Sequence, residues 1–233
     1  MDPRTVVTGS SSQVSESNFL SRVYGWMAVG LGVSAFASYW LLMQPGLLKT
    51  TVVNPVIMIV LFVAELGLVI WLSAAAVRMS VALATSVFLA YSFLNGVTFT
   101  PILLIYTSIS VYSTFAITAG TFFFFSVYGM TTKKDLTSIG NLMVMGLIGI
   151  IIASVVNIFL KSPMLYWIST FVGIAMFLGL IAWDKQKLKG IHAMGFESGD
   201  MQKKVAILGA LTLYLDFINL FILLLRIFGK RRD

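Results

Sequence analysis

The sequence predicts an all-α membrane protein with seven transmembrane helices. Hydrophobic residues make up 58% of the chain and charged residues only 11%, and the mean hydropathy is +0.95. A soluble domain needs roughly a quarter of its residues to be charged, so most of this surface must face lipid. Apolar runs of about 20 residues, the length that crosses a bilayer as a helix, recur along the chain.

Seven apolar segments meet this length requirement. Residues 79–132 contain no charged residue, which is long enough for two spans, and the polar, β-branched stretch 106–113 is the one credible break between them. The longest polar segment, residues 185–204, separates the last two spans. We therefore predict spans at residues 24–43, 54–77, 80–105, 112–130, 139–160, 164–184 and 205–228.

Polar segments are expected at both ends of the chain. The segment before the first apolar run is rich in serine, and no small-residue cleavage site follows that run. Residues 1–21 are therefore expected to form a disordered cytoplasmic tail and not a signal peptide. A single seven-helix transmembrane domain then covers residues 22–229, and a basic C-terminal tail covers residues 230–233.

The distribution of basic residues orients the chain, because Lys and Arg accumulate in cytoplasmic loops. With the N-terminus inside, the outer loops hold only Lys49 and Lys161. The inner side then holds Arg4, Arg22, Arg78, Lys133, Lys134, Lys185, Lys187, Lys189, Lys203 and Lys204. We therefore expect a cytoplasmic N-terminus. The basic tail, with Arg231 and Arg232, leaves two alternatives open: a seventh full span places it outside, or the last segment enters the membrane and returns.

Several classes of function are excluded by the composition. Without cysteine, the chain cannot form a disulfide framework or a thiolate metal site. The basic residues lie between apolar runs, where they meet lipid headgroups, so nucleic-acid binding is not expected. The sequence has no phosphate-binding glycine loop, nucleophile elbow or zinc motif, and we expect neither an enzyme nor a bound cofactor.

Three acidic residues fall within or at the end of the predicted spans: Glu65, Asp184 and Asp216. Ionisable groups are costly in a bilayer and mark functional sites by default. Asp216 lies about eleven residues into the last span, roughly 16 Å along a helix, and Asn219 follows one turn later on the same face. Two interpretations stay open for this face, a structural hydrogen bond between helices or a site for an ion or a proton.

Asp184 ends the sixth span, where by itself it would be an interfacial residue paired with Lys185 or Lys187. Together with Asp216 on the next helix, it can share one proton or one cation. That pairing requires the sixth helix to continue past Asp184, or a water-filled vestibule around both carboxylates. A site of oxygen ligands suits Ca²⁺, which two carboxylates and an amide would bind weakly. The aspartates lack the Gly-x-Gly-Asp motif of intramembrane aspartyl proteases.

The remaining polar residues have simpler interpretations. Glu65 is interpreted as a buried packing residue in preference to a third member of the site. His192, the only histidine, lies in the polar segment before the last span and is expected to be solvated. Pro101 should kink the third helix and free a carbonyl group, which Thr98 or Thr100 can compensate.

Four motifs follow one another from the third predicted helix to the seventh. They are Gly96-Val-Thr-Phe-Thr-Pro101, Tyr128-Gly-Met-Thr-Thr-Lys-Lys-Asp-Leu136, Ala182-Trp-Asp184 with Gln186-Lys-Leu188, and Leu213-Tyr-Leu-Asp-Phe-Ile-Asn-Leu-Phe221 with Leu224-Leu-Arg-Ile-Phe-Gly229. In this order they resemble the Bax inhibitor-1 family of small membrane proteins. The short polar N-terminus, without a proline-rich extension, is similar to the bacterial branch of that family.

The resemblance implies a fold in which two groups of three helices surround a central C-terminal helix. It also implies that the paired aspartates of the family fall on Asp184 and Asp216, and that a latch arginine falls on Arg78. Asn219 and Glu65 are candidate supporting polar residues of this site. A bacterial member is expected in the inner (plasma) membrane, and we expect a monomer.

Two functions are expected as alternatives. The first is a pH-sensitive channel that leaks Ca²⁺, with Asp184 and Asp216 as weak ligands. An ionised aspartate paired with Arg78 would keep it closed, and mild acid would open it. The second is a regulatory membrane protein that binds and restrains a membrane protease or a cell-death or stress-response partner. The first predicts an ion flux that depends on Asp216, whereas the second predicts a co-purifying partner and no effect of Asp216→Asn.

Overall fold

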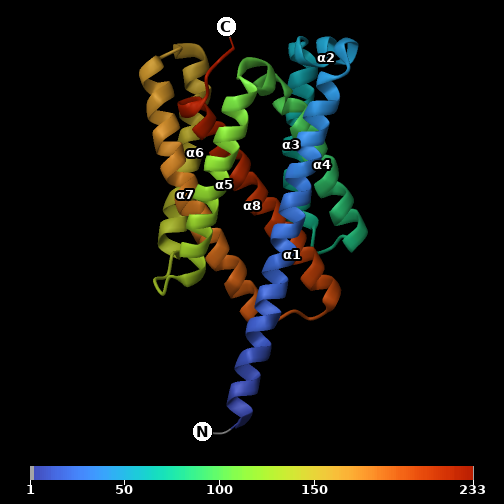
Figure 1. Cartoon of the computed structure of the whole chain (residues 1–233), viewed down its shortest axis with the longest axis vertical. Coiled ribbons are helices and arrows are strands. Elements are labelled where there is room, and N and C mark those ends of the chain that lie inside the picture. Colours follow the sequence, from blue (N-terminus) through green and yellow to red (C-terminus); the bar gives the residue numbers. More distant parts are fainter. Residues whose placement is uncertain (1–2, 233) are drawn as a thin grey trace. The chain divides into compact units, whose positions relative to one another are not determined.

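The structure is a computed structural model that describes residues 3–232, with side chains from Ser15 onward. Within these residues the chain forms helices and no β-strand (Figure 1). The helices are α1 (Pro3–Leu42), α2 (Pro45–Val52), α3 (Pro55–Ala75), α4 (Val81–Ile105), α5 (Ser108–Thr131), α6 (Thr137–Leu160), α7 (Pro163–Ala193) and α8 (Gly199–Phe228).

Seven of the described helices are long and apolar enough to cross a membrane, so the seven predicted spans are confirmed. The fourth span begins at Ser108, earlier than predicted, because Thr107 caps α5. The Thr107 side-chain oxygen accepts a hydrogen bond from the Ser110 backbone N–H at 3.4 Å. The break between the third and fourth spans is therefore only Tyr106 and Thr107.

The short helix α2 is an element that the sequence analysis missed. Pro45 was interpreted as the end of the first span, but it occupies the first turn of α2, where proline is well tolerated because its missing N–H would be unpaired in any case. Asn54 then caps α3, since its side-chain oxygen accepts a hydrogen bond from the Val56 backbone N–H at 3.0 Å. The outer connection after α1 is thus helical over most of its length.

The polar segment before the last span is much shorter than predicted. The helices α7 and α8 continue into it, and only residues 194–198 are not helical. Ser198 caps α8 by accepting a hydrogen bond from the Met201 backbone N–H at 3.1 Å, and Asp200 forms an ion pair with Lys203 at 2.9 Å. The predicted ends of these two helices were wrong because a helix that extends beyond the lipid can carry polar residues.

At the N-terminal end, α1 begins at Pro3, so the structure continues this helix into the residues for which the sequence predicts a disordered tail. The apolar part that qualifies as a membrane span begins at Ser15. The predicted limits of the transmembrane domain stay a prediction.

The chain divides into two compact units. The first unit contains Met1–Ile105 and Ile191–Tyr214, and the second contains Tyr106–Gly190 and Leu215–Asp233. Each unit therefore has three long helices of its own, α1, α3 and α4 in the first and α5, α6 and α7 in the second. The helix α8 supplies residues to both units, which agrees with the expected two groups of three helices and a shared C-terminal helix.

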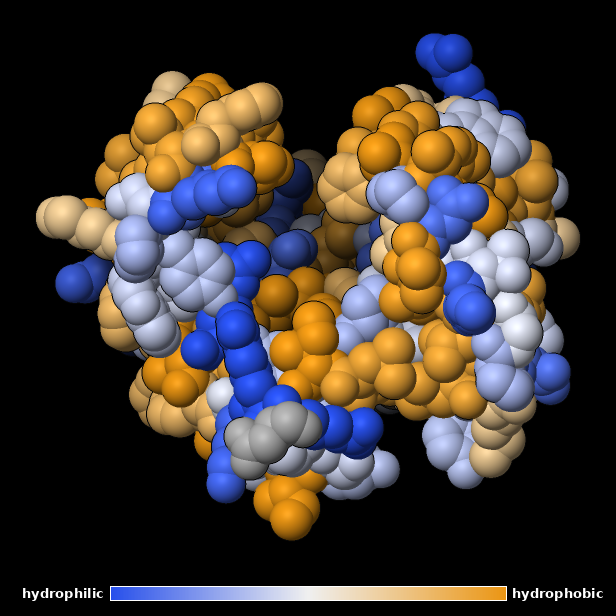
Figure 2. All heavy atoms as spheres, turned by 90° about the horizontal axis from the view of Figure 1, so that it is seen from above, coloured by the Kyte–Doolittle hydropathy of each residue, from blue (hydrophilic) through white to orange (hydrophobic). Residues whose placement is uncertain are grey.

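Burial separates α8 from the other spans. In the most apolar window of α8, 72% of the residues are buried, against at most 39% in the other spans and 0% in α6. Many exposed side chains of α6 are apolar, for example Ile148, Ile152 and Val155. Figure 2 shows hydrophobic side chains over much of the outward surface at one end of the molecule. The apolar sides of the spanning helices, such as that of α6, are expected to meet lipid.

In the first unit, α1 and α4 approach closely because small residues line their contact. A Cβ atom on Gly96 would collide with the carbonyl oxygen of Ser34, so the two backbones are nearly in contact. Ser38 Oγ donates a hydrogen bond to the Gly96 carbonyl at 2.5 Å. Such pairs of small and hydroxyl residues are a common means of packing helices within a membrane.

Pro101 lies within α4, and the helix continues through it. Thr98 and Thr100 donate hydrogen bonds to the carbonyl groups of Asn95 at 3.0 Å and Gly96 at 3.2 Å. Neither hydroxyl therefore caps the Val97 carbonyl, which lacks its usual N–H partner because of the proline.

The basic tail after α8 lies against the connection between α4 and α5. The Thr107 backbone N–H donates a hydrogen bond to the Lys230 carbonyl at 3.0 Å, and the Lys230 N–H donates one to Ser110 Oγ at 2.9 Å. Arg231 forms an isolated β-bridge with Tyr106. Because α8 is one continuous helix that is long and apolar enough to cross a membrane, the structure favours a full span over a segment that enters the membrane and returns.

Candidate proton and cation site

Asp184 is positioned by two glycines that allow α7 to approach its neighbours. A Cβ atom on Gly129 of α5 would collide with the carbonyl oxygen of Ala182, and one on Gly140 of α6 would collide with the Trp183 ring. The backbone before Asp184 is thus held between α5 and α6 at van der Waals distance. The helix α7 continues past Asp184 to Ala193, as the pairing of the aspartates requires.

Gln186 fixes the turn between α5 and α6 against the same part of α7. Its side-chain oxygen accepts a hydrogen bond from the Leu136 N–H at 2.8 Å, and its side-chain nitrogen donates one to the Lys134 carbonyl at 2.8 Å. Lys189 Nζ also donates to the Met130 carbonyl at 3.4 Å. The second and third sequence motifs therefore form one contact.

Asp216 lies on the part of α8 that belongs to the second unit. The adjacent Phe217 packs edge-on against Phe115 and Phe122 of α5, with ring centroids 5.2 and 5.6 Å apart. Near the end of α8, Leu223 packs closely against Gly173 of α7, because a Cβ atom on Gly173 would lie only 2.9 Å from the Leu223 side chain. Aromatic and small residues thus hold this half of α8 against α5 and α7.

The carboxyl groups of Asp184 and Asp216 lie within hydrogen-bonding distance of each other. Both residues are buried, with exposed fractions of 7% and 5%. Among the described residues, no backbone or side-chain donor reaches Asp216 Oδ2. Two carboxylates repel each other and form a hydrogen bond only when one proton lies between them. The arrangement is therefore suited to hold one proton, or a cation in its place.

Lys185 and Lys187 follow Asp184 on α7. Lys187 interacts electrostatically with Asp184, and its Nζ lies 5.0 Å from the centre of the Trp183 ring. Lys185 is only 1% exposed. A positive charge near a buried carboxylate favours its ionised form, so Lys187 opposes the effect of burial at Asp184.

The described residues contain no group of three or more His, Asp or Glu side chains that could hold a metal ion. Asp184 and Asp216 alone offer at most four carboxylate oxygens, whereas a tight Ca²⁺ site uses about six to eight oxygen ligands. The pair alone therefore does not supply enough ligands for a tight Ca²⁺ site.

No contact described in the structure joins Asn219 or Arg78 to the aspartate pair. Asn219 donates its side-chain N–H to the Leu215 carbonyl of its own helix at 2.8 Å. Arg78 is exposed in the turn between α3 and α4 and belongs to the first unit. The role of Arg78 as a latch stays a prediction.

Glu65 belongs to the first unit and has a hydrogen-bond network of its own. It is 5% exposed and accepts hydrogen bonds from Thr98 Oγ1 at 2.7 Å and Asn95 Nδ2 at 3.3 Å. Asn95 Oδ1 in turn accepts from the Tyr214 hydroxyl at 2.7 Å, which lies 2.6 Å from Ser34 Oγ. The sequence analysis missed Asn95, Tyr214 and Ser34. The sequence did hold one signal for them, because each is a polar residue inside a predicted apolar span.

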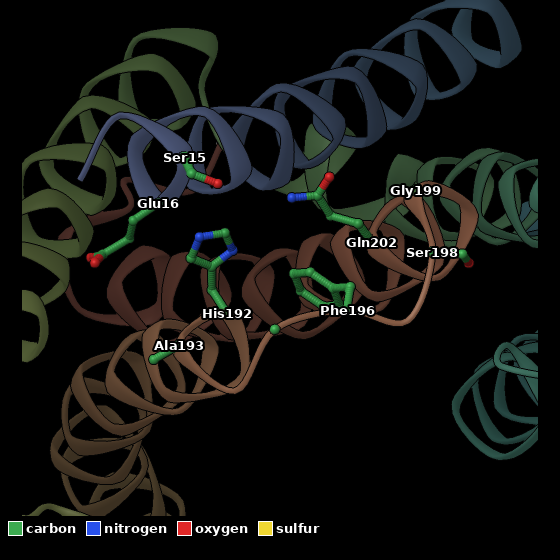
Figure 3. A pocket seen from close by; sticks show the side chains of 9 residues that line it. Ser15, Glu16, His192, Ala193, Phe196, Ser198, Gly199 and Gln202 are labelled. Carbon is green, nitrogen blue, oxygen red and sulfur yellow. The ribbon is translucent and has the colours of Figure 1, made fainter. Parts of the chain in front are cut away.

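His192 lies in the last turn of α7, not in a polar loop. Its ring stacks on Phe19 with centroids 5.1 Å apart, and Phe196 lies 5.7 Å away. The expected place in a polar loop was therefore wrong, because the extended α7 carries His192, and its half-buried ring contacts aromatic side chains. A pocket of about 510 Å³ lies beside it in the first unit, where Ser15 and Gln202 are also part of the wall (Figure 3).

Comparison with known proteins agrees with the resemblance in the motifs. Residues 16–233 match the family described as "Inhibitor of apoptosis-promoting Bax1". Inner membrane protein YbhL of Escherichia coli is 46% identical over 215 residues, which cover 92% of each chain. Uncharacterised proteins of Borreliella burgdorferi and Rickettsia prowazekii are 41% and 38% identical, and cover 94% and 99% of this chain and 94% and 98% of their own. The chain is thus a multi-pass integral membrane protein that belongs to the Bax inhibitor-1 family.

Proposed function

We propose that this protein is a pH-sensitive leak channel for Ca²⁺, controlled by the Asp184–Asp216 pair. The contact between the two buried carboxyl groups is the observation that carries the proposal. In mild acid a proton between them neutralises one negative charge. In alkali both groups ionise and need a cation or a basic side chain nearby. Similarity to an E. coli inner membrane protein supports a place in a bacterial inner membrane. The distribution of basic residues supports an N-terminus in the cytoplasm.

The proposed gate opens when the pair is protonated. Protonation removes the charge that would hold a basic side chain such as Arg78, so flux rises in mild acid and falls in alkali. Because two carboxylates bind Ca²⁺ weakly, the ion is able to leave as readily as it enters, as conduction requires.

Liposomes that contain a Ca²⁺-sensitive dye and the purified protein provide the test. We expect a higher Ca²⁺ flux at mildly acidic than at alkaline pH, and a much smaller pH dependence for Asp184→Asn and Asp216→Asn. Asp200→Asn is the matched control, because it makes the same chemical change at an exposed residue, and it should behave as the unmodified protein. Equal, background-level flux in every sample would contradict the channel.

The description of the matching family as an inhibitor favours a second candidate, a regulatory protein that restrains a membrane protease or a stress-response partner. This function predicts a partner that co-purifies equally with the unmodified protein and with Asp216→Asn. Crosslinking in intact membranes, followed by purification of both forms, distinguishes it from the channel.

A further inference from the structure

Glu65 is the acidic residue that the proposed channel does not use. It lies in the middle of α3, a span in which only 11% of the most apolar window is buried, and yet its own side chain is 5% exposed. Its hydrogen-bond donors are the neutral groups of Thr98 and Asn95. Among the described residues, the interactions given for Glu65 are with Thr98 and Asn95, and none is with Lys, Arg or His. An ionised carboxylate in this position would lack a compensating charge.

Counting hydrogen atoms shows which form of Glu65 fits the contacts. The Thr98 hydroxyl has one hydrogen but lies near two acceptors, Glu65 Oε1 at 2.7 Å and the Asn95 carbonyl at 3.0 Å. With an ionised Glu65, the two contacts must share this single hydrogen in a weaker, bifurcated bond. With a protonated Glu65, the acid O–H donates to Thr98 Oγ1 and the Thr98 hydrogen goes to the Asn95 carbonyl. The neutral acid therefore satisfies both contacts.

The orientation of the Asn95 amide agrees with this assignment. Its Oδ1 accepts from the Tyr214 hydroxyl at 2.7 Å, so its Nδ2 must face Glu65 Oε2, which accepts as the carbonyl oxygen of the acid. The titratable groups that face this site from the neighbouring helices are Tyr91 of α4, whose hydroxyl lies 3.5 Å from Asn95 Nδ2, and Tyr214 of α8. Tyrosine is uncharged near neutral pH.

We propose that Glu65 is a separate proton-binding site, at which a neutral carboxylic acid joins α3 to α4 and, through Asn95 and Tyr214, to α8. The site is independent of the Asp184–Asp216 pair and of the proposed channel. When alkali removes the proton, an uncompensated negative charge remains between α3 and α4. The contribution of this site to stability is therefore present at neutral pH and is lost as the pH rises.

Infrared difference spectroscopy tests the proton directly. Subtracting the Glu65→Gln spectrum from that of the unmodified protein at neutral pH should leave the C=O band of a protonated carboxylic acid, and the band should disappear in alkali. The same subtraction in an Asp184→Asn, Asp216→Asn background should give the same band, which excludes the aspartate pair as its source. A carboxylate band in place of the acid band at neutral pH would overturn the proposal.

Thermal unfolding in detergent provides a second readout. Gln has an NH₂ group and a carbonyl oxygen in place of the acid O–H and C=O, so Glu65→Gln should match the unmodified protein at neutral pH and lose less stability in alkali. Thr98→Val removes the acceptor of the acid O–H and should shift the infrared band. If Glu65→Gln is strongly destabilised at neutral pH, or if Thr98→Val leaves the band unchanged, the neutral acid is wrong. Neither measurement depends on Ca²⁺ flux.

Discussion

The hydroxyl of Tyr214 on α8 donates a hydrogen bond to Asn95 Oδ1 on α4 at 2.7 Å. Tyr214 is fully buried and also lies 2.6 Å from Ser34 Oγ of α1, so one hydroxyl connects three helices of the first unit. Tyr214→Phe should lower the free energy of unfolding by about 1–3 kcal/mol, because it leaves a buried amide oxygen without a donor. Thermal or denaturant unfolding in detergent measures the loss.

The control for Tyr214 is Tyr39→Phe, which removes the same hydroxyl from a residue that is 59% exposed and should change stability little. Equal effects of the two substitutions would mean that the hydrogen bond to Asn95 does not stabilise the first unit.

The contact between α1 and α4 predicts the effect of an added methyl group. In Gly96→Ala the new Cβ would meet the Ser34 backbone and lie 2.8 Å from the Ala37 Cβ, and neither neighbour can move without shifting a helix. We expect a loss of about 1–3 kcal/mol, as in other overpacked contacts. Gly67→Ala has no atom within 4 Å of the new Cβ and should be neutral or stabilising by up to about 1 kcal/mol. Unfolding of both variants in the same detergent decides this point.

The two hydrogen bonds of Gln186 predict a local effect. Gln186→Leu removes the acceptor of the Leu136 N–H and the donor to the Lys134 carbonyl, so the turn between α5 and α6 should open more often. Hydrogen exchange at Leu136 should accelerate roughly five- to hundredfold, which corresponds to about 1–3 kcal/mol. Gln186→Glu keeps the acceptor and should protect Leu136 better than Gln186→Leu. The same exchange rate in all three proteins would show that Gln186 does not hold the turn.

Asp135, in the same turn and outside the spans, gives a pH dependence. Hydrogen bonds from the Thr137 side chain and backbone N–H lower the pKa of Asp135, and the backbone bond is 2.9 Å long. A lowered pKa means that the interaction is present above the usual aspartate value of about 3.9 and is lost as the pH falls through the lower, folded-state value. Exchange of the Thr137 amide, corrected for its intrinsic pH dependence, should lose protection there. Asp135→Asn keeps an acceptor that does not titrate and should remove the transition.

The spans were predictable because lipid leaves a strong signal in the sequence. An apolar run with few charges must be helical in a membrane, since every backbone N–H and C=O needs a partner within the segment. The ends of α7 and α8 were not predictable in the same way. Outside the lipid a helix can carry polar residues, so Lys187 and Lys203 were assigned to a connection although both are helical. The helix α2 was missed because a proline after an apolar run is typical of the end of a helix, whereas Pro45 begins α2.

The aspartate pair and the Glu65 network differ in what the sequence can reveal. Asp184 and Asp216 lie on consecutive spans within specific motifs, and their contact was predicted. The partners of Glu65 lie 30 and 33 residues away, and asparagine and threonine are too common in membrane helices to single out. The neutral state of Glu65 depends on which hydroxyl faces which carbonyl, and no pattern in the sequence contains that information.

The hydrogen bond between the C-terminal tail and Thr107 offers a way to determine on which side of the membrane the connection between α4 and α5 lies. The connection of Tyr106 and Thr107 is too short to accept a reporter domain without separating α4 from α5. The tail residues Lys230 and Arg231 lie at this connection, so a phosphatase or fluorescent protein fused after them reports the side of the membrane on which both emerge. Seven of the described helices are long and apolar enough to cross a membrane, and with seven crossings such a fusion would also assign the opposite side to the N-terminus.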